Sequence, residues 1–359
     1  MALFTPFTLR SVTFPNRVGV SPMCQYSAEG GFANDWHLVH LGARAAGGAG
    51  LVVAEATAVS PEGRITPHDL GIWSDEHVAT LARVAAFLRA QGSVAGIQLA
   101  HAGRKASTKR PWDGGGGASA GEGGWTPVFG PSPVPFDDGW QVPAPLDEGE
   151  MDRIAEAFAG GASRAAAAGF LVAEIHAAHG YLLHSFLSPL SNGRTDSFGG
   201  SLRNRMRFPL RVVAAVRAAW PDALPLFLRL SATDWVEGGF VPEEAVAFAR
   251  EAKSLGVDLV DCSSGGGHPG AKVPVAPGYQ VPFARRIREE ADVPTAAVGL
   301  ITDPAQAEEI VRSGSADVVL LGREMLRNPH WALRASAELG TPHPGPRPYE
   351  RARPFSAVG

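Results

Sequence analysis

Cysteine is scarce in this chain, with only Cys24 and Cys262 among 359 residues. Two thiols are too few for the disulfide framework of a small secreted domain, and they fit a reducing cytoplasm. Long apolar runs are also missing, because none approaches the ~20 residues that a membrane-spanning helix needs. The first residues show no basic segment followed by an apolar core, so no signal peptide is expected. We therefore expect a cytoplasmic protein with no membrane partner.

The chain has no large excess of charge of either sign. Its formal net charge is −4 at pH 7, and 19% of its residues are charged against 45% hydrophobic. This balance is typical of a globular protein and offers no electrostatic reason to bind nucleic acid or an anionic membrane. We therefore predict that nucleic acid is not a partner.

What the chain does contain is a regular alternation of strand-like and helix-like segments. Eight short apolar runs occur at residues 17–23, 50–56, 94–100, 170–173, 226–230, 257–262, 295–299 and 316–322. Because the runs are continuous rather than alternating, they are typical of strands covered on both faces. No G-x-G-x-x-G follows the first run. Eight such units favour a (β/α)8 TIM barrel over a doubly wound sheet, as one domain over residues 1–359.

Several helices carry recognisable start and stop signals. Ser74 is expected to cap a helix that ends at Gly92. Pro242 suits the first turn of a second helix. The pair Asp303-Pro304 is expected to open a third.

Residues 102–147 form too long a gap to be one packed helix. The segment contains glycine at each of positions 114–117 and many prolines. A loop of this length in a compact domain is usually functional or disordered. Because it follows the third strand, we interpret it as a lid over the site; a surface insertion without function is the alternative. Residues 341–359 are rich in proline and arginine, and we expect an irregular tail there.

Two imidazoles and a phenol, His176, His179 and Tyr181, follow the fourth apolar run. The carboxyl ends of strands are where parallel α/β proteins keep their chemistry. Two imidazoles can hold one oxygen atom, and a phenol two residues further on can supply a proton. A metal site and a purely structural histidine pair are the alternatives. His37 and His40 are interpreted as structural partners on one helix.

Small residues and an arginine stand at the last two strand ends. Gly322-Arg323, together with Gly299 after the seventh run, suggests a phosphate site, because small residues let backbone N–H groups approach an anion. The guanidinium adds a planar cation suited to phosphate. An ordinary surface turn is the alternative interpretation.

Polar residues also lie inside two of the apolar runs. Arg229 must be paired or must serve a ligand, and an ion pair with a barrel carboxylate such as Glu55 or Glu174 is the alternative. The amide of Gln98 must satisfy its hydrogen bonds internally or on a planar heterocycle. Cys24, at the first strand end, is either functional or an inert buried thiol.

These stretches together resemble the Old Yellow Enzyme family of flavin-dependent ene-reductases, and most of all its bacterial branch called thermophilic-like. The similarity extends from residue 4 to about residue 351. The matching stretches are 16–17 with 21–26, 35–37, 55–59, 63–66, 98–105, 176–182, 192–196 with 198–201 and 204–205, and 321–323.

The resemblance implies non-covalently bound FMN and the reduction of activated C=C bonds by NAD(P)H, usually NADPH, with ping-pong kinetics. The substrates would be α,β-unsaturated carbonyl or nitro compounds. His176 and His179 would bind the substrate oxygen, Tyr181 would donate the proton, and Tyr26 would contact the substrate. In a homodimer or homotetramer, Arg351 would reach the neighbouring subunit's site. The predicted FMN-binding residues are Ser21, Pro22, Met23, Cys24, Ala56, Gln98, Arg229, Gly299, Gly322 and Arg323.

The sequence departs from the family pattern at a few positions. Arg211, beside an unusual Pro209, stands where the family usually has glutamate, and Ser185 and Gly193 are also atypical. None of these residues belongs to the proposed site, so they bear on how the helices pair. Two alternatives remain at this stage: a metal-dependent TIM-barrel hydrolase, and a non-catalytic protein that binds flavin or a phosphate ligand.

Overall fold

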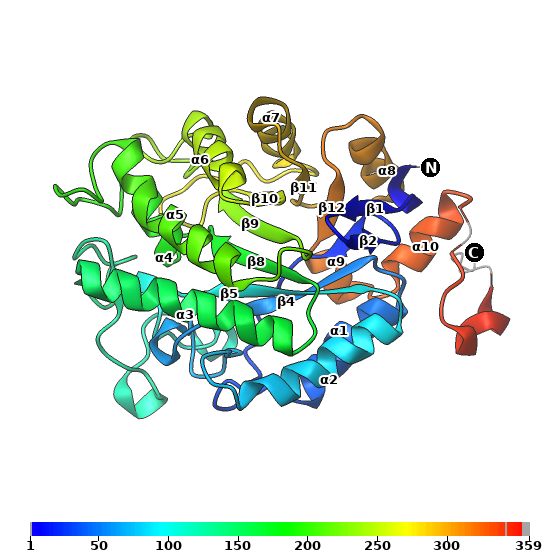
Figure 1. Cartoon of the computed structure of the whole chain (residues 1–359), viewed down its shortest axis with the longest axis horizontal. Helices are drawn as coiled ribbons and strands as arrows, with labels where there is room; N and C mark the ends of the chain where they lie inside the picture. The colour runs from blue at the N-terminus through cyan, green and yellow to red at the C-terminus, as the bar shows by residue number, and fades with distance from the viewer. Residues whose placement is uncertain (1, 342, 354–359) are drawn as a thin grey trace.

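Eight parallel strands close into a barrel in the computed structural model, which describes residues 2–341 and 343–353 (Figure 1). Their order around the barrel is β10-β11-β12-β3-β4-β5-β8-β9. The predicted (β/α)8 barrel is confirmed, and each of the eight apolar runs contains or overlaps one strand. The strands are β3 (Val18–Val20), β4 (Leu51–Ala58), β5 (Val94–Ala100), β8 (Val172–Ala177), β9 (Leu226–Ser231), β10 (Leu259–Ser263), β11 (Thr295–Ala297) and β12 (Val318–Leu321).

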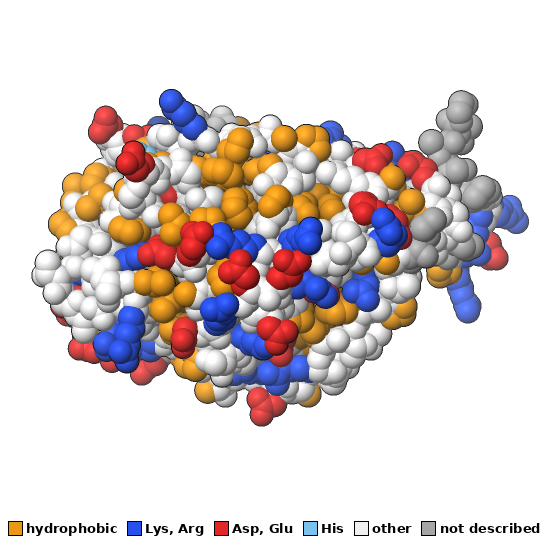
Figure 2. Space-filling view, turned by 90° about the horizontal axis from the view of Figure 1, so that it is seen from above, with side chains coloured by type: hydrophobic (Ala, Val, Ile, Leu, Met, Phe, Trp, Pro, Cys, Tyr) orange, Lys and Arg blue, Asp and Glu red, His pale blue; other side chains and the backbone are white. Residues whose placement is uncertain are grey.

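Helices surround the strands, as Figure 1 shows. They are α1 (Asp35–Ala46), α2 (His77–Ala90), α3 (Glu148–Ala167), α4 (Leu182–Leu187), α5 (Leu202–Ala219), α6 (Pro242–Ser254), α7 (Val281–Ala291), α8 (Pro304–Arg312), α9 (Arg323–Arg327) and α10 (Trp331–Glu338). In the part of the chain that the structure describes, no helix is long and apolar enough to cross a membrane. On the face shown in Figure 2, acidic and basic side chains are interspersed.

The expected helix signals are partly confirmed. Pro242 opens α6, and the Asp303 side chain caps α8 by accepting from the backbone N–H of Gln306. The prediction for Ser74 was wrong, because α2 begins at His77 with Glu76 at the N-cap position. Ser74 instead belongs to a turn before the helix, where its hydroxyl accepts from the backbone N–H of Glu76 at 3.3 Å.

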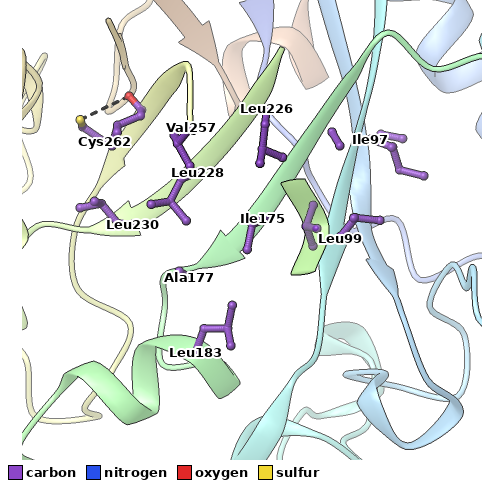
Figure 3. Packing of buried hydrophobic residues seen from close by; sticks show 14 of the residues in the cluster. Ile97, Leu99, Ile175, Ala177, Leu183, Leu226, Leu228, Leu230, Val257 and Cys262 are labelled. Atoms are coloured by element: carbon purple, nitrogen blue, oxygen red, sulfur yellow. Dashed lines mark hydrogen bonds between the residues drawn. The ribbon is translucent and has the colours of Figure 1, made fainter. Parts of the chain in front are cut away.

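Alternation along each strand separates the outer core from the barrel interior. Leu226, Leu228 and Leu230 of β9 pack outward in one hydrophobic cluster with Ile175 of β8 and with helix residues (Figure 3). The residues between them therefore point into the barrel: Phe227, Arg229 and Ser231 from β9, and Glu174 and His176 from β8. This alternation places the polar residues of apolar runs inside the barrel.

A hairpin covers the amino-terminal end of the barrel. Its strands are β1 (Phe7–Leu9) and β2 (Val12–Phe14), and the Phe14 ring stacks on Phe227 with centroids 6.2 Å apart. The same cluster includes the first residue of five barrel strands, namely Leu51, Val94, Val172, Leu259 and Val318. Because this end is filled by apolar side chains, a polar site fits only the carboxyl end.

The segment 102–147 contains only short elements. These are η3 (Gly103–Lys105), η4 (Pro111–Asp113), η5 (Ala120–Glu122), β6 (Phe129–Gly130) and β7 (Ala144–Pro145). Hydrogen bonds hold it to the body; the backbone N–H of Thr108, for example, donates to Ile65 at 2.8 Å. At its tip, Gly114, Gly115 and Gly116 adopt φ of +98°, +62° and +71° with open space around each.

The atypical Arg211 has a structural partner on the neighbouring helix. Its guanidinium lies 2.5 Å from Asp152 and 3.3 Å from Glu148, both on α3. The helix pairing between α5 and α3 is thus supported by an ion pair in which α5 supplies the positive charge.

Candidate active site

Strand register brings the inward-facing polar residues into neighbouring positions. His176 of β8 is paired with Arg229 of β9, which is in turn paired with Asp261 of β10. Glu174 is paired with Gln98 of β5 in the same way. A continuous polar layer therefore crosses the barrel just below its carboxyl end.

The imidazoles of His176, which is buried, and His179, which is half-buried, are both neutral. Their ring centroids lie 5.1 Å apart at 90°. Burial lowers the pKa of both rings well below the usual value, and the nearby charge of Arg229 lowers it further. The Nδ1 atom of His176 accepts from the backbone N–H of Ala178 at 3.2 Å, so the neutral ring carries its proton on Nε2. That N–H is available as a hydrogen-bond donor.

A buried network fixes the turn that carries His179. Nδ1 of His184 accepts from the backbone N–H of Gly180 at 2.8 Å, and its Nε2 lies 3.2 Å from Asp234. Burial by itself raises the pKa of Asp234, but hydrogen bonds from His184 and Ser188 hold it at about 2. The backbone at His179 is left-handed, with φ of +59°. Sequence reasoning missed His184 and Asp234, because neither stands at a strand end.

The phenol of Tyr181 stands next to His176. The two ring centroids are 4.9 Å apart, edge to face. Burial raises the pKa of Tyr181 well above its usual value, so the phenol keeps its proton at neutral pH. Tyr181 and Ala56 line a small hollow together with Asp69. This arrangement leaves a protonated donor beside the neutral imidazoles.

Cys24 and Tyr26 follow β3 and lie near Asp69, which lines this hollow. Burial raises the pKa of the Cys24 thiol well above its usual value, and the Asp69 and Glu55 carboxyls act in the same direction. The backbone at Tyr26 is left-handed, with φ of +50°. The ring of Tyr26 meets the edge of Trp112, from the segment 102–147, with centroids 5.8 Å apart.

An open pocket lies on the opposite side of the barrel mouth, with about 560 Å³ of empty space that extends into solvent. Four predicted cofactor residues line it: Arg229, Gly299, Gly322 and Arg323. Sequence reasoning missed two other lining residues, Ser263 and Gln280. The Ser263 hydroxyl lies 2.7 Å from Nε2 of His179, which joins this pocket to the imidazole pair. A serine at the end of an apolar strand was the available signal for Ser263.

Arg229 forms a buried ion pair with a residue that the sequence did not indicate. Its Nε lies 3.0 Å from Oδ2 of Asp261, instead of pairing with Glu55 or Glu174. Asp261 is the residue of β10 that stands opposite Arg229 in the strand register. The Glu55 carboxylate instead accepts a hydrogen bond from the backbone N–H of Gln25. The Asp261 carboxylate thus compensates the charge of Arg229 on one side of the guanidinium. The same side chain also lines the open pocket.

The Gln98 amide has a partner inside the barrel. Its Nε2 donates to Oε1 of Glu174 at 2.7 Å. Burial raises the pKa of Glu174 to about 8, and the Asp261 carboxyl contributes while Arg229 opposes the shift. Gln98 therefore belongs to the polar layer below the pocket.

The remaining predicted residues fall into two groups. Ser21 donates its backbone N–H to Leu321 at 3.0 Å, and a Cβ on Gly322 would lie 3.7 Å from Met23, so the end of β3 adjoins the end of β12 with Pro22 between them. Arg351, in contrast, lies exposed on η6 (Arg347–Ala352), on the far side of the molecule from α4 (Figure 1). The structure does not bring Arg351 to this chain's own site.

His37 is structural, as predicted. Its Nδ1 accepts from the backbone N–H of Asn34 in the capping box of α1. Burial lowers the pKa of His37 to about 4 and that of its helix neighbour His40 to about 3. Within residues 2–341 and 343–353, no three side chains of His, Cys, Asp or Glu gather as metal ligands would.

Comparison with known proteins gives concordant results. The sequence model of the NADH:flavin oxidoreductase / NADH oxidase family matches residues 2–341. An NADPH dehydrogenase of Geobacillus sp. (strain WCH70) is 48% identical over 355 residues, or 98% of this chain and 99% of that protein. An NADPH dehydrogenase of Bacillus subtilis (strain 168) is 46% identical over 351 residues, or 97% and 98% of the two chains.

Solved structures with the same fold are more distant in sequence. Morphinone reductase superposes with a TM-score of 0.78 at 28% identity, over 96% of this chain and 91% of that chain. An Old Yellow Enzyme homologue from Zymomonas mobilis has a TM-score of 0.79 at 26% identity, over 95% and 94% of the two chains. The match therefore extends over the whole barrel and is not confined to single motifs.

Proposed function

Since the chain belongs to the NADH:flavin oxidoreductase / NADH oxidase family and is a flavin-dependent oxidoreductase, we propose that it reduces activated C=C bonds at the expense of NADPH. The acceptors are α,β-unsaturated carbonyl or nitro compounds. We propose NADPH rather than NADH as the reductant because relatives that match nearly the full length are NADPH dehydrogenases. The observation that carries this proposal is the pair of neutral imidazoles, His176 and His179, with the protonated phenol of Tyr181 beside them.

The pocket at the barrel mouth fits FMN. A guanidinium and small residues line it, and Arg229 faces it with only one side of its charge compensated. We expect Arg229, Gly299, Gly322 and Arg323 to hold the non-covalently bound cofactor, with the residues after β3 and Ala56 beside it. When bound, FMN supplies the two-electron chemistry that links oxidation of NADPH to reduction of the alkene.

The substrate side of the site stabilises negative charge on an oxygen. As the β-carbon is reduced, electron density moves to the carbonyl or nitro oxygen. The Nε2–H of His176 and the ring of His179 hold this oxygen, and their donors stabilise it more as its charge grows. The phenol of Tyr181 then delivers its proton to the α-carbon. Because NADPH and the alkene use the same site in turn, the kinetics are ping-pong.

The segment 102–147 contributes a wall of the substrate site in this proposal. Trp112 contacts Tyr26, and Arg110 lies over the Trp112 ring, 5.5 Å from its centroid. These contacts bring the segment to the residue expected to touch the substrate. Both cysteines are free thiols, which supports a reducing cytoplasm as the working compartment.

The test is spectroscopic. Purified protein reconstituted with FMN should be yellow, lose its colour anaerobically with NADPH, and regain it when cyclohexenone, a maleimide or a nitroalkene is added. Initial rates over both substrates should give parallel double-reciprocal lines. Protein that is folded but does not retain FMN, or that keeps its colour with NADPH, would contradict the proposal.

A further inference from the structure

Lys105 ties together two loops at the substrate side of the barrel mouth. It lies on η3, shortly after β5, and is half-buried. Its Nζ donates to the backbone carbonyl of His179 at 2.9 Å and to that of Gly266 at 3.0 Å. The first carbonyl belongs to the β8–α4 turn (residues 178–181), and the second to the β10–α7 loop (residues 264–280).

The two loops meet in strained, closely packed backbone. His179, Gly180 and Gly266 have φ of +59°, +75° and +79°. A Cβ on Gly180 would lie 2.5 Å from the Gly266 oxygen, and one on Gly266 would lie 2.8 Å from the His179 Cα. A non-glycine residue holds a left-handed conformation only where its surroundings fix it. The bond from Lys105 to the His179 carbonyl is one such fixing contact.

Lys105 also places a second positive charge near the imidazoles, in addition to that of Arg229. Its Nζ lies 5.1 Å from the centroid of the Tyr181 ring and 4.3 Å from that of Phe136. The charges of Arg229 and Lys105 both lower the pKa of His176 and His179. The neutral imidazoles therefore lie in the field of two cations, which favours an anion bound by these rings.

The surroundings of Lys105 leave it protonated at neutral pH. Burial lowers its pKa to about 8, and the charge of Arg104 acts in the same direction. The titratable or charged groups that face it are Arg104 from η3 and three side chains of the β8–α4 turn and the end of β8, namely His176, His179 and Tyr181. The β10–α7 loop contributes the Gly266 carbonyl.

We propose that Lys105 is a positioning residue for the oxyanion site, since it holds the His179 peptide across the two loops and turns a positive charge toward the oxygen that His176 and His179 bind. The inference rests on the proposed function of that site. Lys105 acts through His179 and through its field, and no contact with the reacting carbons is required.

The test uses FMN-loaded protein and 4-nitrophenol, because the phenolate oxygen resembles the anion formed during alkene reduction and its ionisation is visible in the absorption spectrum. Wild-type protein should bind the phenolate and lower the apparent pKa of the bound phenol. In Lys105→Met, the phenolate should bind ~10-fold more weakly, and that apparent pKa should rise by about 1 unit. Reduction by NADPH should change less than phenolate binding, since it develops no anion on the held oxygen.

Two further variants separate positioning from loss of structure. Lys105→Arg keeps the charge and the donors, so it should recover most of the phenolate affinity. Lys109→Met is the matched control and should behave as wild type, because Lys109 lies on the same segment and its Nζ faces Glu122 at 3.8 Å. If Lys105→Met does not retain FMN, the comparison is made with Lys105→Arg and Lys105→Gln.

Equal phenolate affinity in wild type, Lys105→Met and Lys105→Gln would overturn the inference while leaving the proposed function intact. Recovery of the affinity by Lys105→Gln, which lacks the charge, would overturn its electrostatic part. Failure of the wild-type protein itself to bind FMN or the phenolate would instead count against the proposed function.

Discussion

At the scale of single residues, the site depends on side chains that burial keeps uncharged. In the proposed mechanism the phenol of Tyr181 must carry its proton, and the neutral rings of His176 and His179 offer N–H donors without adding charge to the site. His176 is buried and the other two are half-buried, so all three have little water around them, and the two neighbouring cations disfavour protonation of the imidazoles. The electrostatic setting is thus complete before a substrate arrives.

Removing one donor tests the oxyanion role directly. We expect His176→Ala to slow reoxidation of the reduced protein by cyclohexenone ~100-fold, or about 3 kcal/mol of barrier, because one stabilising N–H is lost. FMN content should remain near that of wild type. The measurement is anaerobic stopped-flow absorption, and an unchanged reoxidation rate would remove His176 from the substrate site.

The pH dependence follows from the lowered pKa of both imidazoles. The usual histidine value is 6.5, and in the folded chain both values lie well below it, so these rings do not titrate near pH 6.5. Both rings lower the free energy of unfolding as pH falls below 6.5. In that range the unfolded chain binds a proton on each ring, whereas the folded chain does not. Glu174 acts in the opposite sense, since its pKa is raised and the folded chain binds its proton more readily.

Alkene reduction should therefore show no acid limb near pH 6.5 from these two rings. The check is the reoxidation rate constant measured from pH 5.5 to 7.5 at saturating substrate, in wild type and in His176→Asn. A limb near pH 6.5 that disappears in the variant would show that His176 is protonated in that range, against the burial argument.

At the scale of elements, the site is made where loops after different strands touch. The β8–α4 turn and the β10–α7 loop meet so closely at Gly180 and Gly266 that a side chain has no room there. The network of His184 and Asp234 supports the first of these segments from behind. Contact between these two segments therefore sets where the ring of His179 points.

A pair of glycine variants isolates this contact. Gly180 and Gly238 have nearly the same φ, +75° and +73°, but a Cβ on Gly180 would strike the Gly266 oxygen while Gly238 is surrounded by open space. Gly238→Ala should cost about 1 kcal/mol of unfolding free energy from backbone strain alone. Gly180→Ala should cost more than ~3 kcal/mol and reduce alkene turnover as well. Denaturant unfolding measures both; equal losses would show that the loop contact is unimportant.

At the scale of the whole molecule, the barrel has one closed end and one reactive end. The β1–β2 hairpin fills the amino-terminal end with apolar side chains, and the polar layer lies at the other. The C-terminal tail belongs to neither end of the barrel. Its short helix η6 lies at the edge of the molecule, away from α4 (Figure 1). Residues 342 and 354–359 of the expected tail 341–359 lie outside the described residues.

The exposed position of Arg351 suits a role in a neighbouring subunit. In a homodimer or homotetramer, Arg351→Ala should raise the KM for charged or nitro substrates severalfold without changing FMN content, whereas Arg347→Ala on the same short helix should have little effect. Steady-state kinetics and light scattering would be measured together. A monomer in solution, or identical KM values, would contradict the subunit-crossing role.

The sequence by itself determined the barrel and which three side chains of the candidate site leave the same strand. Continuous apolar runs followed by helix patterns specify strands buried on both faces, and this pattern is local enough to be recognised one unit at a time. The same holds for His176, His179 and Tyr181, which leave one strand together, and for Pro242 and Asp303, which act on their own helices. The prediction that Ser74 caps α2 was wrong because Ser74 forms a turn with Glu76 just before the helix begins.

Only the tertiary structure decided which distant residues meet. Arg229 pairs with Asp261 and Gln98 with Glu174 because strand register aligns them, although each pair is distant in the sequence. The same is true of Ser263, which reaches His179, and of Lys105, which bonds to two loops that come from different strands. Register and loop contact depend on closure of the whole barrel, so no local pattern could have shown these partners.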